Sequence, residues 1–359
     1  KRQPRHLWAL ACALSAFAAG ADFSEPLAPV PPAEVPAAEP EKGPEPAKPP
    51  DPEKPPEPAP AVPSADRPDS KVEGYAPLAT GGEGGQAFEV TSLEDSGAGS
   101  LREVLDKVNA FGSKPARIVF KVGGEILVLS PLHLDVSNVT LDGSTAPAPG
   151  ITLNARDIMK YLFDEEGFLT QPVPKVRNRF KPGATRVFRG PLLAIAKVEN
   201  IVVRDVRFRE SPSHQIHVAG SAKRFLFDHI TSTSCGDGAL FLNNGCENIT
   251  VCWSIFAGCT LCVRTRGNRV SFHHNLFIEN AQRHPLVRGD DIRDLRNNAI
   301  LGWRVAGIYT SELETPKINV VNCFFSPPAG SRDPARALEI RGKGKIWAKG
   351  NVGPGTFDV

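Results

Sequence analysis

The segment Asn200-Ile-Val-Val-Arg-Asp-Val-Arg-Phe208 decides the fold, because similar short segments follow it at nearly constant intervals. The later copies begin at Arg224, Asn248, Arg269, Ile292 and Lys317. Successive starts are 24, 24, 21, 23 and 25 residues apart. A period in this range is typical of a solenoid, in which each repeat covers the apolar face of the repeat before it.

Each copy has the composition of a β-strand. β-branched and aromatic residues dominate the copies, and apolar and polar residues alternate where each copy begins. The copies lack helix formers at the helical spacing and also lack the leucine-rich pattern. We therefore predict a parallel β-helix with two or three short strands in each coil. The alternative is an antiparallel β-sandwich, but hairpin signals such as Asn-Gly recur too rarely to support it.

Stacked coils would place residues that are one period apart above each other, at the spacing of about 4.8 Å between paired strands. The two stacks predicted in this way are Val203, Phe227, Val251 and Phe272, which would face inward, and Asp205, His229, Trp253 and His274. The register of the coils therefore decides which distant side chains share a surface.

The N-terminal part of the sequence differs from the repeats in composition. Residues 1–21 combine basic residues, an apolar stretch and small residues in the order of a secretory signal peptide. Residues 22–71 are rich in proline, alanine and glutamate, which indicates an extended linker that cannot form a core. Residues 72–359 are expected to form the folded domain. We expect a secreted, periplasmic or cell-envelope protein, with no membrane contact beyond the export signal.

Two cysteines follow the same period. Cys235 and Cys259 are 24 residues apart, so stacking would bring them onto adjacent coils. An exported protein meets an oxidising compartment, where a disulfide between them is permitted. The alternative is a pair of small buried residues in a stack. Cys259 and Cys262 also form one Cys-x-x-Cys pattern, which is weak evidence for zinc without a second pair.

A series of motifs runs through residues 74–303. The N-terminal motifs are Thr80-Gly-Gly-Glu-Gly-Gly85, Arg117-Ile-Val-Phe-Lys-Val-Gly-Gly-Glu-Ile126 and Val139-Thr-Leu-Asp-Gly-Ser-Thr-Ala-Pro147. The later motifs are Phe227-Asp-His229, Phe272-His-His-Asn-Leu-Phe277 and Arg283-His-Pro-Leu-Val-Arg288. Their joint occurrence in this order resembles the pectate lyase superfamily of polysaccharide lyases, in its bacterial form. The resemblance implies an all-β, right-handed parallel β-helix that cleaves an acidic, uronate-containing polysaccharide, above all pectate, by β-elimination.

The resemblance also implies roles for particular arginines. In the family an arginine removes the proton at C5 of the uronate, while calcium and basic side chains stabilise the charge that develops on its carboxylate. Arg283 matches the base, and Arg288 matches the arginine that holds the substrate carboxylate. Where the family has a lysine one coil earlier, this chain has Arg264 and Arg266, and we expect Arg264 to take that place. Because guanidinium ordinarily keeps its proton, such a base needs burial and neighbouring cations.

The histidines belong to motifs that are mainly structural in the family. We expect Asp228, His229 and His274 to bond within stacks beside the cleft. A metal site is the alternative for His229 and His274. His273 and His274 are adjacent on one strand and would point to opposite faces, so they are poorly placed to bind one ion together.

The calcium ligands of the family are mostly replaced in this sequence. Calcium prefers several carboxylate oxygens, but His214 and Pro212 stand where acids are expected, and one coil later Asp237 remains as the candidate metal ligand. Three interpretations stay open. Calcium binds only when substrate carboxylates complete its shell; or His214, His217 and Arg264 supply the positive charge and bind substrate directly; or the chain is no longer a lyase.

The leading hypothesis is a monomeric, secreted lyase whose partner is an acidic polysaccharide and not a nucleic acid; the formal net charge of +2 selects no partner by itself. The alternative is a catalytically silent β-helix that binds glycans or serves as an envelope scaffold. A glycoside hydrolase needs paired acids on one face, and Asp237 has no evident partner. Residues 154–197 interrupt the repeat, either as a wall of the cleft or as a surface insertion.

Overall fold

The computed structural model describes residues 74–75, 79–156, 190–211, 213–328 and 335–359. The predicted signal peptide (1–21) and linker (22–71) lie outside the described residues, as does most of the 154–197 interruption. Strands dominate the described residues, together with helix α2 (Leu101–Phe111) and the short 3-10 turn η2 (Gly143–Thr145). In the ranges given above, no helix combines the length and the apolar character needed to cross a membrane.

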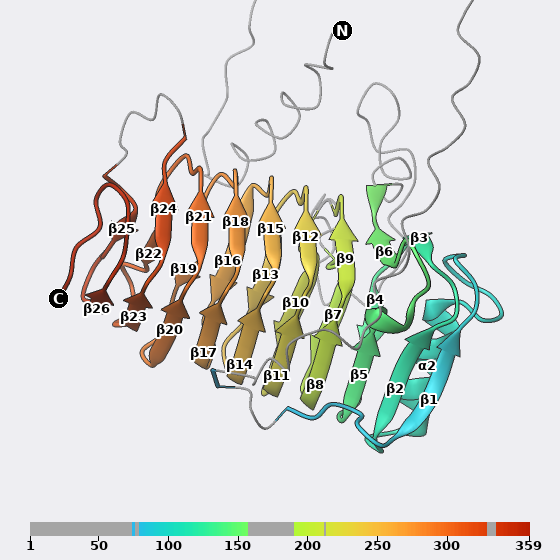
Figure 1. The fold of residues 1–359 in the computed structure, drawn as a ribbon. Helices are drawn as coiled ribbons and strands as arrows, with labels where there is room; N and C mark the ends of the chain where they lie inside the picture. Colours follow the sequence, from blue (N-terminus) through green and yellow to red (C-terminus); the bar gives the residue numbers. More distant parts are fainter. Residues whose placement is uncertain (1–73, 76–78, 157–189, 212, 329–334) are drawn as a thin grey trace, which may run out of the picture. The chain divides into compact units, whose positions relative to one another are not determined.

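The described strands form three parallel sheets, here called sheets A, B and C (Figure 1). Sheet A contains β1 (Gln86–Val90), β2 (Ala116–Phe120), β5 (Val139–Asp142), β8 (Glu199–Arg204), β11 (Lys223–Asp228), β14 (Glu247–Cys252), β17 (Asn268–His273), β20 (Ile292–Arg296), β23 (Lys317–Val321) and β26 (Lys345–Lys349). Sheet B contains β3 (Gly124–Leu127), β6 (Ile151–Asn154), β9 (Val206–Arg209), β12 (Thr231–Thr233), β15 (Ile255–Ala257), β18 (Leu276–Ile278), β21 (Ala299–Leu301) and β24 (Phe324–Ser326). Sheet C contains β4 (Leu132–Leu134), β7 (Leu193–Ala196), β10 (Ile216–Ala219), β13 (Gly238–Leu242), β16 (Leu261–Thr265), β19 (Leu286–Val287), β22 (Ile308–Thr310) and β25 (Leu338–Glu339).

Most coils contribute one strand to each sheet, in the chain order A, B, C. In sheet A, for example, β11 pairs in parallel with β8 on one side and with β14 on the other. The prediction of a parallel β-helix is confirmed, and the antiparallel sandwich is excluded. The interruption predicted at 154–197 includes the last residue of β6 and the whole of β7. Residues at both ends of the predicted range therefore belong to regular coils.

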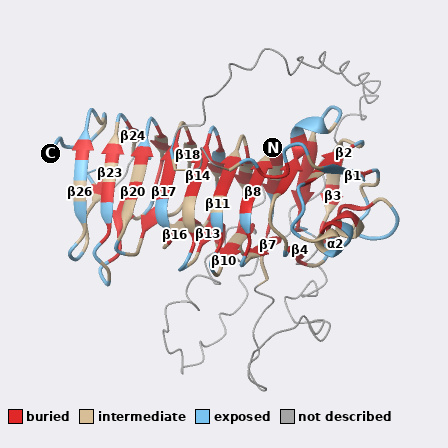
Figure 2. Ribbon diagram, turned by 90° about the horizontal axis from the view of Figure 1, so that it is seen from below, coloured by how far each residue is buried: buried red, intermediate tan, exposed pale blue. Residues whose placement is uncertain are grey.

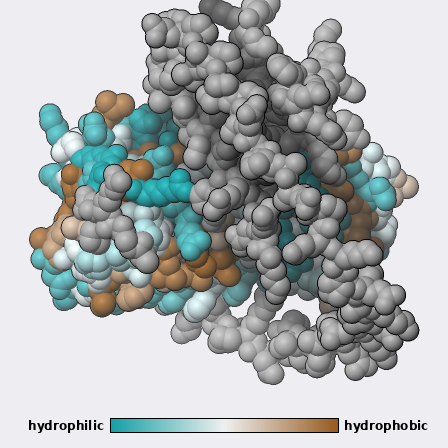
Figure 3. Space-filling model, turned by 90° about the horizontal axis from the view of Figure 1, so that it is seen from above, coloured by the Kyte–Doolittle hydropathy of each residue, from teal (hydrophilic) through white to brown (hydrophobic). Residues whose placement is uncertain are grey.

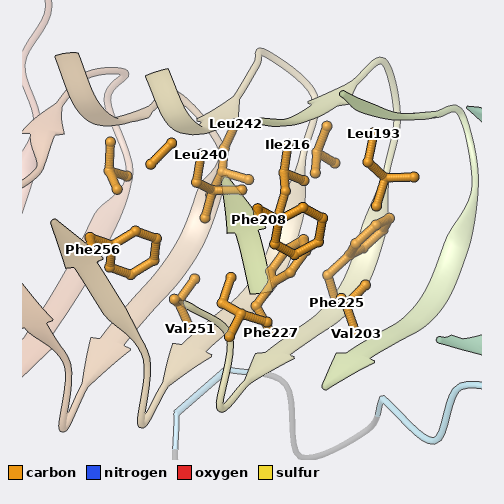
Figure 4. Packing of buried hydrophobic residues seen from close by; sticks show 14 of the residues in the cluster. Leu193, Val203, Phe208, Ile216, Phe225, Phe227, Leu240, Leu242, Val251 and Phe256 are labelled. Atoms are coloured by element: carbon orange, nitrogen blue, oxygen red, sulfur yellow. The ribbon is translucent and has the colours of Figure 1, made fainter. Parts of the chain in front are cut away.

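The inward stack predicted from the sequence is present in sheet A. Phe227 pairs with Val203 and Val251, and Val251 pairs with Phe272. All four side chains are fully buried, and Figure 4 shows Val203, Phe227 and Val251 following one another inside the coils. Full burial of such a side chain contributes about 1.5–3 kcal/mol. Figure 2 shows the same division across the domain, with buried residues along the strands and exposed residues mainly in the loops.

Sheets A and B meet at a sharp bend in each coil, here called the A–B corner. The bend residue has a positive φ, between 51° and 57°, in six successive coils, at Asp205, His229, Trp253, His274, Asn297 and Asn322. Residues with a side chain rarely adopt this conformation, so the corner imposes it. The second predicted stack is therefore confirmed: the Trp253 ring lies 6.2 Å from that of His229 and 4.3 Å from that of His274, with nearly parallel planes.

Buried asparagines satisfy the backbone groups on the inner side of the A–B corner. Asn275 Oδ1 accepts from the Ser254 N–H (3.0 Å), and its amide donates to the Val251 carbonyl (2.9 Å). One coil later, Asn298 accepts from the Asn275 N–H (3.0 Å) and donates to the Phe272 carbonyl (2.9 Å). A buried polar group without a partner costs about 1–3 kcal/mol, so this ladder stabilises the bend.

Helix α2 packs on β1 and β4. Ser100 caps its N-terminus by accepting from the Glu103 N–H (3.2 Å), while the Glu103 carboxylate accepts from the Gly99 N–H (2.7 Å). This arrangement is close to a capping box and satisfies donors that the first helical turn leaves free. The buried face of the helix consists of Leu101, Val104, Leu105 and Val108.

The segment that precedes β1 crosses sheet A on its outer side. The Tyr75 N–H donates to Ser271 Oγ (3.1 Å) in β17. The N–H groups of Thr80 and Gly81 donate to Asn200 Oδ1 (2.8 and 2.9 Å) in β8. This N-terminal strap, residues 74–75 and 79–82, therefore contacts coils that are not neighbours in the stack.

The predicted disulfide between Cys235 and Cys259 is not formed. Both residues are buried free thiols on adjacent coils, as the period requires, and the Cys259 thiol donates to the Ala257 carbonyl (3.6 Å). Burial, followed by the contact with Cys259, raises the pKa of the Cys235 thiol well above its ordinary value. The alternative of a buried pair in a stack is therefore the correct one, because register fixes adjacency but does not form the bond.

Candidate active site

The outer face of sheet C carries one side chain from each coil in the same register, here called the sheet C row. His217 pairs with Phe241, and Phe241 pairs with Arg264. Arg264 pairs with Leu286, and Leu286 pairs with Tyr309. Because successive side chains of a strand alternate between faces, the neighbours of these residues point inward. The row thus brings an imidazole, a phenyl ring, a guanidinium group and a phenol onto one surface.

His214 lies just before β10, against this row. Its ring stacks on Phe241 with centroids 4.4 Å apart, and its Nε2 lies 3.6 Å from Asp237 Oδ2. Burial lowers the pKa of His214 to about 4, and burial followed by the charge of Arg264 lowers the pKa of His217. Both imidazoles are therefore neutral at pH 7. Of the three basic side chains expected to replace the charge of calcium, Arg264 is therefore the one that carries a charge here.

Arg264 is the cation of the row. Its guanidinium carbon lies 3.5 Å from the centroid of the Phe241 ring, a cation–π contact. Burial, and then the charges of Arg283, Arg288 and Arg266, lower the pKa of Arg264 to about 10. Its Nε is buried without a hydrogen-bond partner among the described residues. The side chain as a whole is half-buried, and a guanidinium group that remains partly exposed can bind a carboxylate.

Arg283 reaches the same surface from the turn before β19, where its φ is 70°. Its charge opposes the burial that raises the pKa of Tyr309, whose hydroxyl donates to Gln282 Oε1 (2.9 Å). The Nε of Arg283 is buried without a hydrogen-bond partner among the described residues. Arg283 and Arg264 are both close enough to His214 to influence its pKa. The structure thus brings together these three predicted site residues from separate coils.

Arg288 points to the same side but already holds a carboxylate of the chain. Its Nη2 lies 3.1 Å from Glu314 Oε1, and Arg266 Nη2 lies 2.6 Å from the same oxygen. Burial opposes ionisation of Glu314, but hydrogen bonds from Arg288, Ser311 and Arg266 prevail and lower its pKa to about 2. In this arrangement an internal carboxylate, that of Glu314, occupies the guanidinium group of Arg288 that was predicted to bind the substrate carboxylate.

The residues around Asp237 do not fit a resident calcium ion. Calcium takes about six to eight oxygen ligands, whereas Asp237 lies beside the neutral imidazole of His214. In the part of the chain that the structure describes, no group of three or more His, Cys, Asp or Glu residues is arranged to hold a metal. Asp237 is therefore better described as the partner of His214 than as part of a calcium cage.

Asp228, His229 and His274 lie at the A–B corner and not on sheet C. Asp228 Oδ1 is 2.6 Å from His229 Nδ1, and His274 stacks on Trp253. The predicted bonding within a stack is present. Their place beside the cleft stays a prediction, because these residues lie at the A–B corner whereas the candidate site described here lies on sheet C.

Sequence reasoning missed three residues of the site. Phe241 and Tyr309 lie one coil before and two coils after Arg264 in the sheet C row, so counting the register could have found them. Glu314 lies in the loop between β22 and β23, where no periodic signal marks it. Figure 3 shows that hydrophilic and hydrophobic side chains both reach the part of this face that grey atoms do not cover.

The fold and the site define a parallel β-helix protein with a cationic surface lined by aromatic rings. No family model matches the chain. The probable pectate lyase C of Emericella nidulans is 28% identical over 270 residues, which cover 72% of this chain and 53% of that protein. The probable pectate lyase C of Aspergillus flavus is 29% identical over 272 residues, which cover 71% of this chain and 54% of that protein. The chain thus spans about half the length of the curated relatives it matches.

Solved structures share the same fold. Jun a 1, the major allergen from cedar pollen, superimposes with a TM-score of 0.55 at 19% identity, over 80% of this chain and 85% of the allergen. The pectate lyase from Bacillus sp. N165 in complex with trigalacturonate gives a TM-score of 0.54 at 17% identity, over 80% and 88% of the two chains. The chain is thus similar in sequence to proteins named probable pectate lyase C, and it shares the fold of these solved structures.

Proposed function

We propose that this protein cleaves an acidic polysaccharide, above all pectate, by β-elimination on the outer face of sheet C. The observation that carries this proposal is the meeting of Arg283 and Arg264, which lie close enough to influence each other's charge. Both side chains are half-buried, so part of each remains exposed to the carboxylate and hydroxyl groups of a uronate. The relatives named as probable pectate lyases support the same class of reaction.

In this reaction a base removes the proton at C5, which is next to the carboxylate. The electron pair of the C5–H bond forms the C4=C5 double bond, the C4–O bond breaks, and the departing oxygen takes a proton from water. Negative charge develops on the carboxylate, and cations that are fixed before substrate arrives stabilise it. Arg264 is the cation for this role because the Phe241 ring holds its guanidinium group in place.

Arg283 is the proposed base. A guanidinium group ordinarily keeps its proton, so its neighbours must favour the neutral form. Arg283 lies close to Arg264, and after burial the charge of Arg283 is the largest contribution to the lowered pKa of Arg264. Because His214 is neutral, it adds no third positive charge beside Arg264 and Arg283.

Incubation of the purified protein with polygalacturonate tests the proposal through the ultraviolet absorbance of the unsaturated product. We expect turnover with calcium and also with a chelator, because the described site provides arginines and no calcium cage. The lyase proposal fails if pectate, pectin and alginate all give no product in either condition.

A glycan-binding β-helix without turnover is the second candidate. The pairing of Arg288 with Glu314 favours it, because this contact removes a cation that a lyase would use on its substrate. Binding of polygalacturonate without any unsaturated product selects this candidate over the first.

We further propose that residues 1–21 export the protein, that residues 22–71 act as a spacer, and that residues 72–359 work as a monomer outside the cytoplasm. The order of basic, apolar and small residues supports export. Mass spectrometry of the protein recovered from an expressing culture tests it: cleavage after Ala21 is expected in the exported fraction.

A further inference from the structure

The contact between Glu314 and two arginines stands out because it lies on the proposed substrate side. Arg266 donates to Glu314 Oε1 through Nε (3.2 Å) and Nη2 (2.6 Å). Arg288 Nε donates to Glu314 Oε2 (3.1 Å). Both carboxylate oxygens are therefore engaged, and the Glu314 side chain is only 14% exposed.

The arginine pair continues the surface of the proposed active site. Arg266 lies two positions after Arg264 in one coil, and Arg288 lies two positions after Leu286 in the next, so both follow the outward alternation of the sheet C row. The Arg288 N–H donates to the Thr265 carbonyl (2.8 Å), which keeps the two coils in register here. An open pocket of about 540 Å³ adjoins the pair and is lined by Arg266, Glu314, Asn244, Gly245, Asn268, Gly289, Asp290 and Asp291.

The loop that carries Glu314 joins β22 to β23 and is held on both sides of this residue. On one side, the Leu313 N–H donates to Ser311 Oγ (3.2 Å). On the other side, the N–H and the hydroxyl of Thr315 both donate to Asp290 Oδ1 (2.8 Å each). Its tip, Leu313, is 84% exposed. The loop is therefore held closed by a few surface hydrogen bonds, and its exposed tip buries little apolar surface.

We propose that Glu314 is a built-in competitor for the carboxylate of the substrate, and that the 311–316 loop closes a uronate subsite formed by Arg266 and Arg288. The inference rests on the proposed function. The side chain of Glu314 and a uronate present the same group, a carboxylate with two acceptor oxygens, to the same guanidinium groups. A polymer that extends from Arg264 toward this pair must therefore displace Glu314 before it can use both arginines.

The competitor sets chain-length specificity. A short oligomer that is held by Arg264 and Arg283 alone does not require displacement of the loop. A longer oligomer gains a further ion pair only after Glu314 has left. Removing the charge of Glu314 should therefore strengthen binding of long oligomers and leave binding of short ones nearly unchanged.

Calorimetric titration at one fixed ionic strength tests the inference, with trigalacturonate and hexagalacturonate as probes. Glu314→Gln keeps the shape of the side chain and removes its charge, while Glu312→Gln makes the same charge change at an exposed position of the same loop. We expect Glu314→Gln to bind hexagalacturonate about tenfold more tightly than wild type, which corresponds to about 1.4 kcal/mol. Glu312→Gln should match wild type, and adding Arg288→Ala to Glu314→Gln should abolish the gain. Thermal unfolding of each variant verifies that it is folded.

Unchanged or weaker binding of hexagalacturonate by a folded Glu314→Gln variant overturns the inference, and weaker binding would instead make Glu314 a positioning residue for the arginines. The failure of the proposed function has a different signature. If wild type shows no turnover but Glu314→Gln still gains affinity for the long oligomer, the lyase proposal fails and the competitor stands. If wild type binds and turns over substrate but Glu314→Gln gains nothing, the competitor fails and the lyase stands.

Discussion

The A–B corner and the outer face of sheet C are built by the same repeat but treat polar groups differently. At the corner, Asn275 and Asn298 bond the buried backbone, and Asp228 bonds His229. On sheet C, the buried Nε atoms of Arg264 and Arg283 have no hydrogen-bond partner among the described residues. Unpaired buried atoms also occur away from this surface, for example at Arg224 and Trp303, so sheet C is distinguished by the meeting of its arginines with aromatic rings and not by unpaired atoms alone.

The comparison teaches that a stack of histidines is not by itself a site. The corner histidines lie in a stack with Trp253 that serves the fold, whereas His214 on sheet C is buried beside two arginines. The difference lies in charge: sheet C gathers guanidinium groups that repel each other, and the corner pairs its charges. Four changes can break or sharpen this contrast.

Arg283→Ala removes the proposed base from the sheet C side and should have the largest effect. General-base catalysis contributes about 10²–10⁴-fold, so we expect kcat to fall by about 10³-fold. The thermal midpoint should change little, because the half-buried side chain serves no inward stack. Initial rates at saturating polygalacturonate measure the effect. If Arg283→Ala keeps its kcat while Arg264→Ala loses it, the role of base passes to Arg264.

Acidification tests the burial of His214. The unfolded chain binds a proton at this residue near its ordinary pKa of 6.5, whereas folded His214 stays neutral down to about 4. The unfolded state therefore binds more protons as the pH falls through this window. The free energy of unfolding should decrease there, by at most about 3 kcal/mol from this residue. Below the folded pKa the loss levels off.

Urea unfolding at pH 7 and pH 4.5 measures this effect in wild type and in His214→Gln. The pKa of buried His284 is also lowered to about 4, but this residue is present in both proteins and cancels in the comparison. The variant should lose part of the pH dependence. An identical dependence in both proteins contradicts the assignment.

Asn275→Ala breaks the corner side of the comparison. It leaves the Ser254 N–H and the Val251 carbonyl without their partner, so the free energy of unfolding should fall by about 1–3 kcal/mol. The kcat per folded molecule should stay unchanged. Asn268→Ala, at an exposed position of β17, is the matched control and should change stability by less than about 0.5 kcal/mol. A loss of kcat in folded Asn275→Ala would tie the corner to the chemistry.

Trp253→Ala should have the smallest effect. The side chain is 45% exposed and stacks on His274 at 4.3 Å, a contact that contributes about 0.5–1.5 kcal/mol. Stability should fall by that amount, with activity retained. Chemical unfolding measures the stability, and the lyase assay measures the activity. A loss of activity comparable with that of Arg283→Ala would mean that the corner takes part in the site.

Features that depend on the coil period could be predicted from the sequence. Phe227 lies between Val203 and Val251 because stacking fixes the register, and Arg264 and Arg283 meet because both belong to sheet C coils. Glu314 could not be predicted, since it lies in an aperiodic loop and its partner Arg266 is 48 residues away. The position of the histidine stack relative to the site was also beyond the sequence, because the period gives spacing along the stack and not the corner of the coil.

The N-terminal strap has a consequence for how the domain comes apart. In a stack where each coil touches only its neighbours, stability is nearly a sum of local terms and the ends can fray one coil at a time. The strap joins the coil of Asn200 to that of Ser271 across the coils between them. Those coils should therefore melt as one cooperative block. A protease that attacks fraying ends would then meet a protected middle, which is where the arginine-lined surface lies.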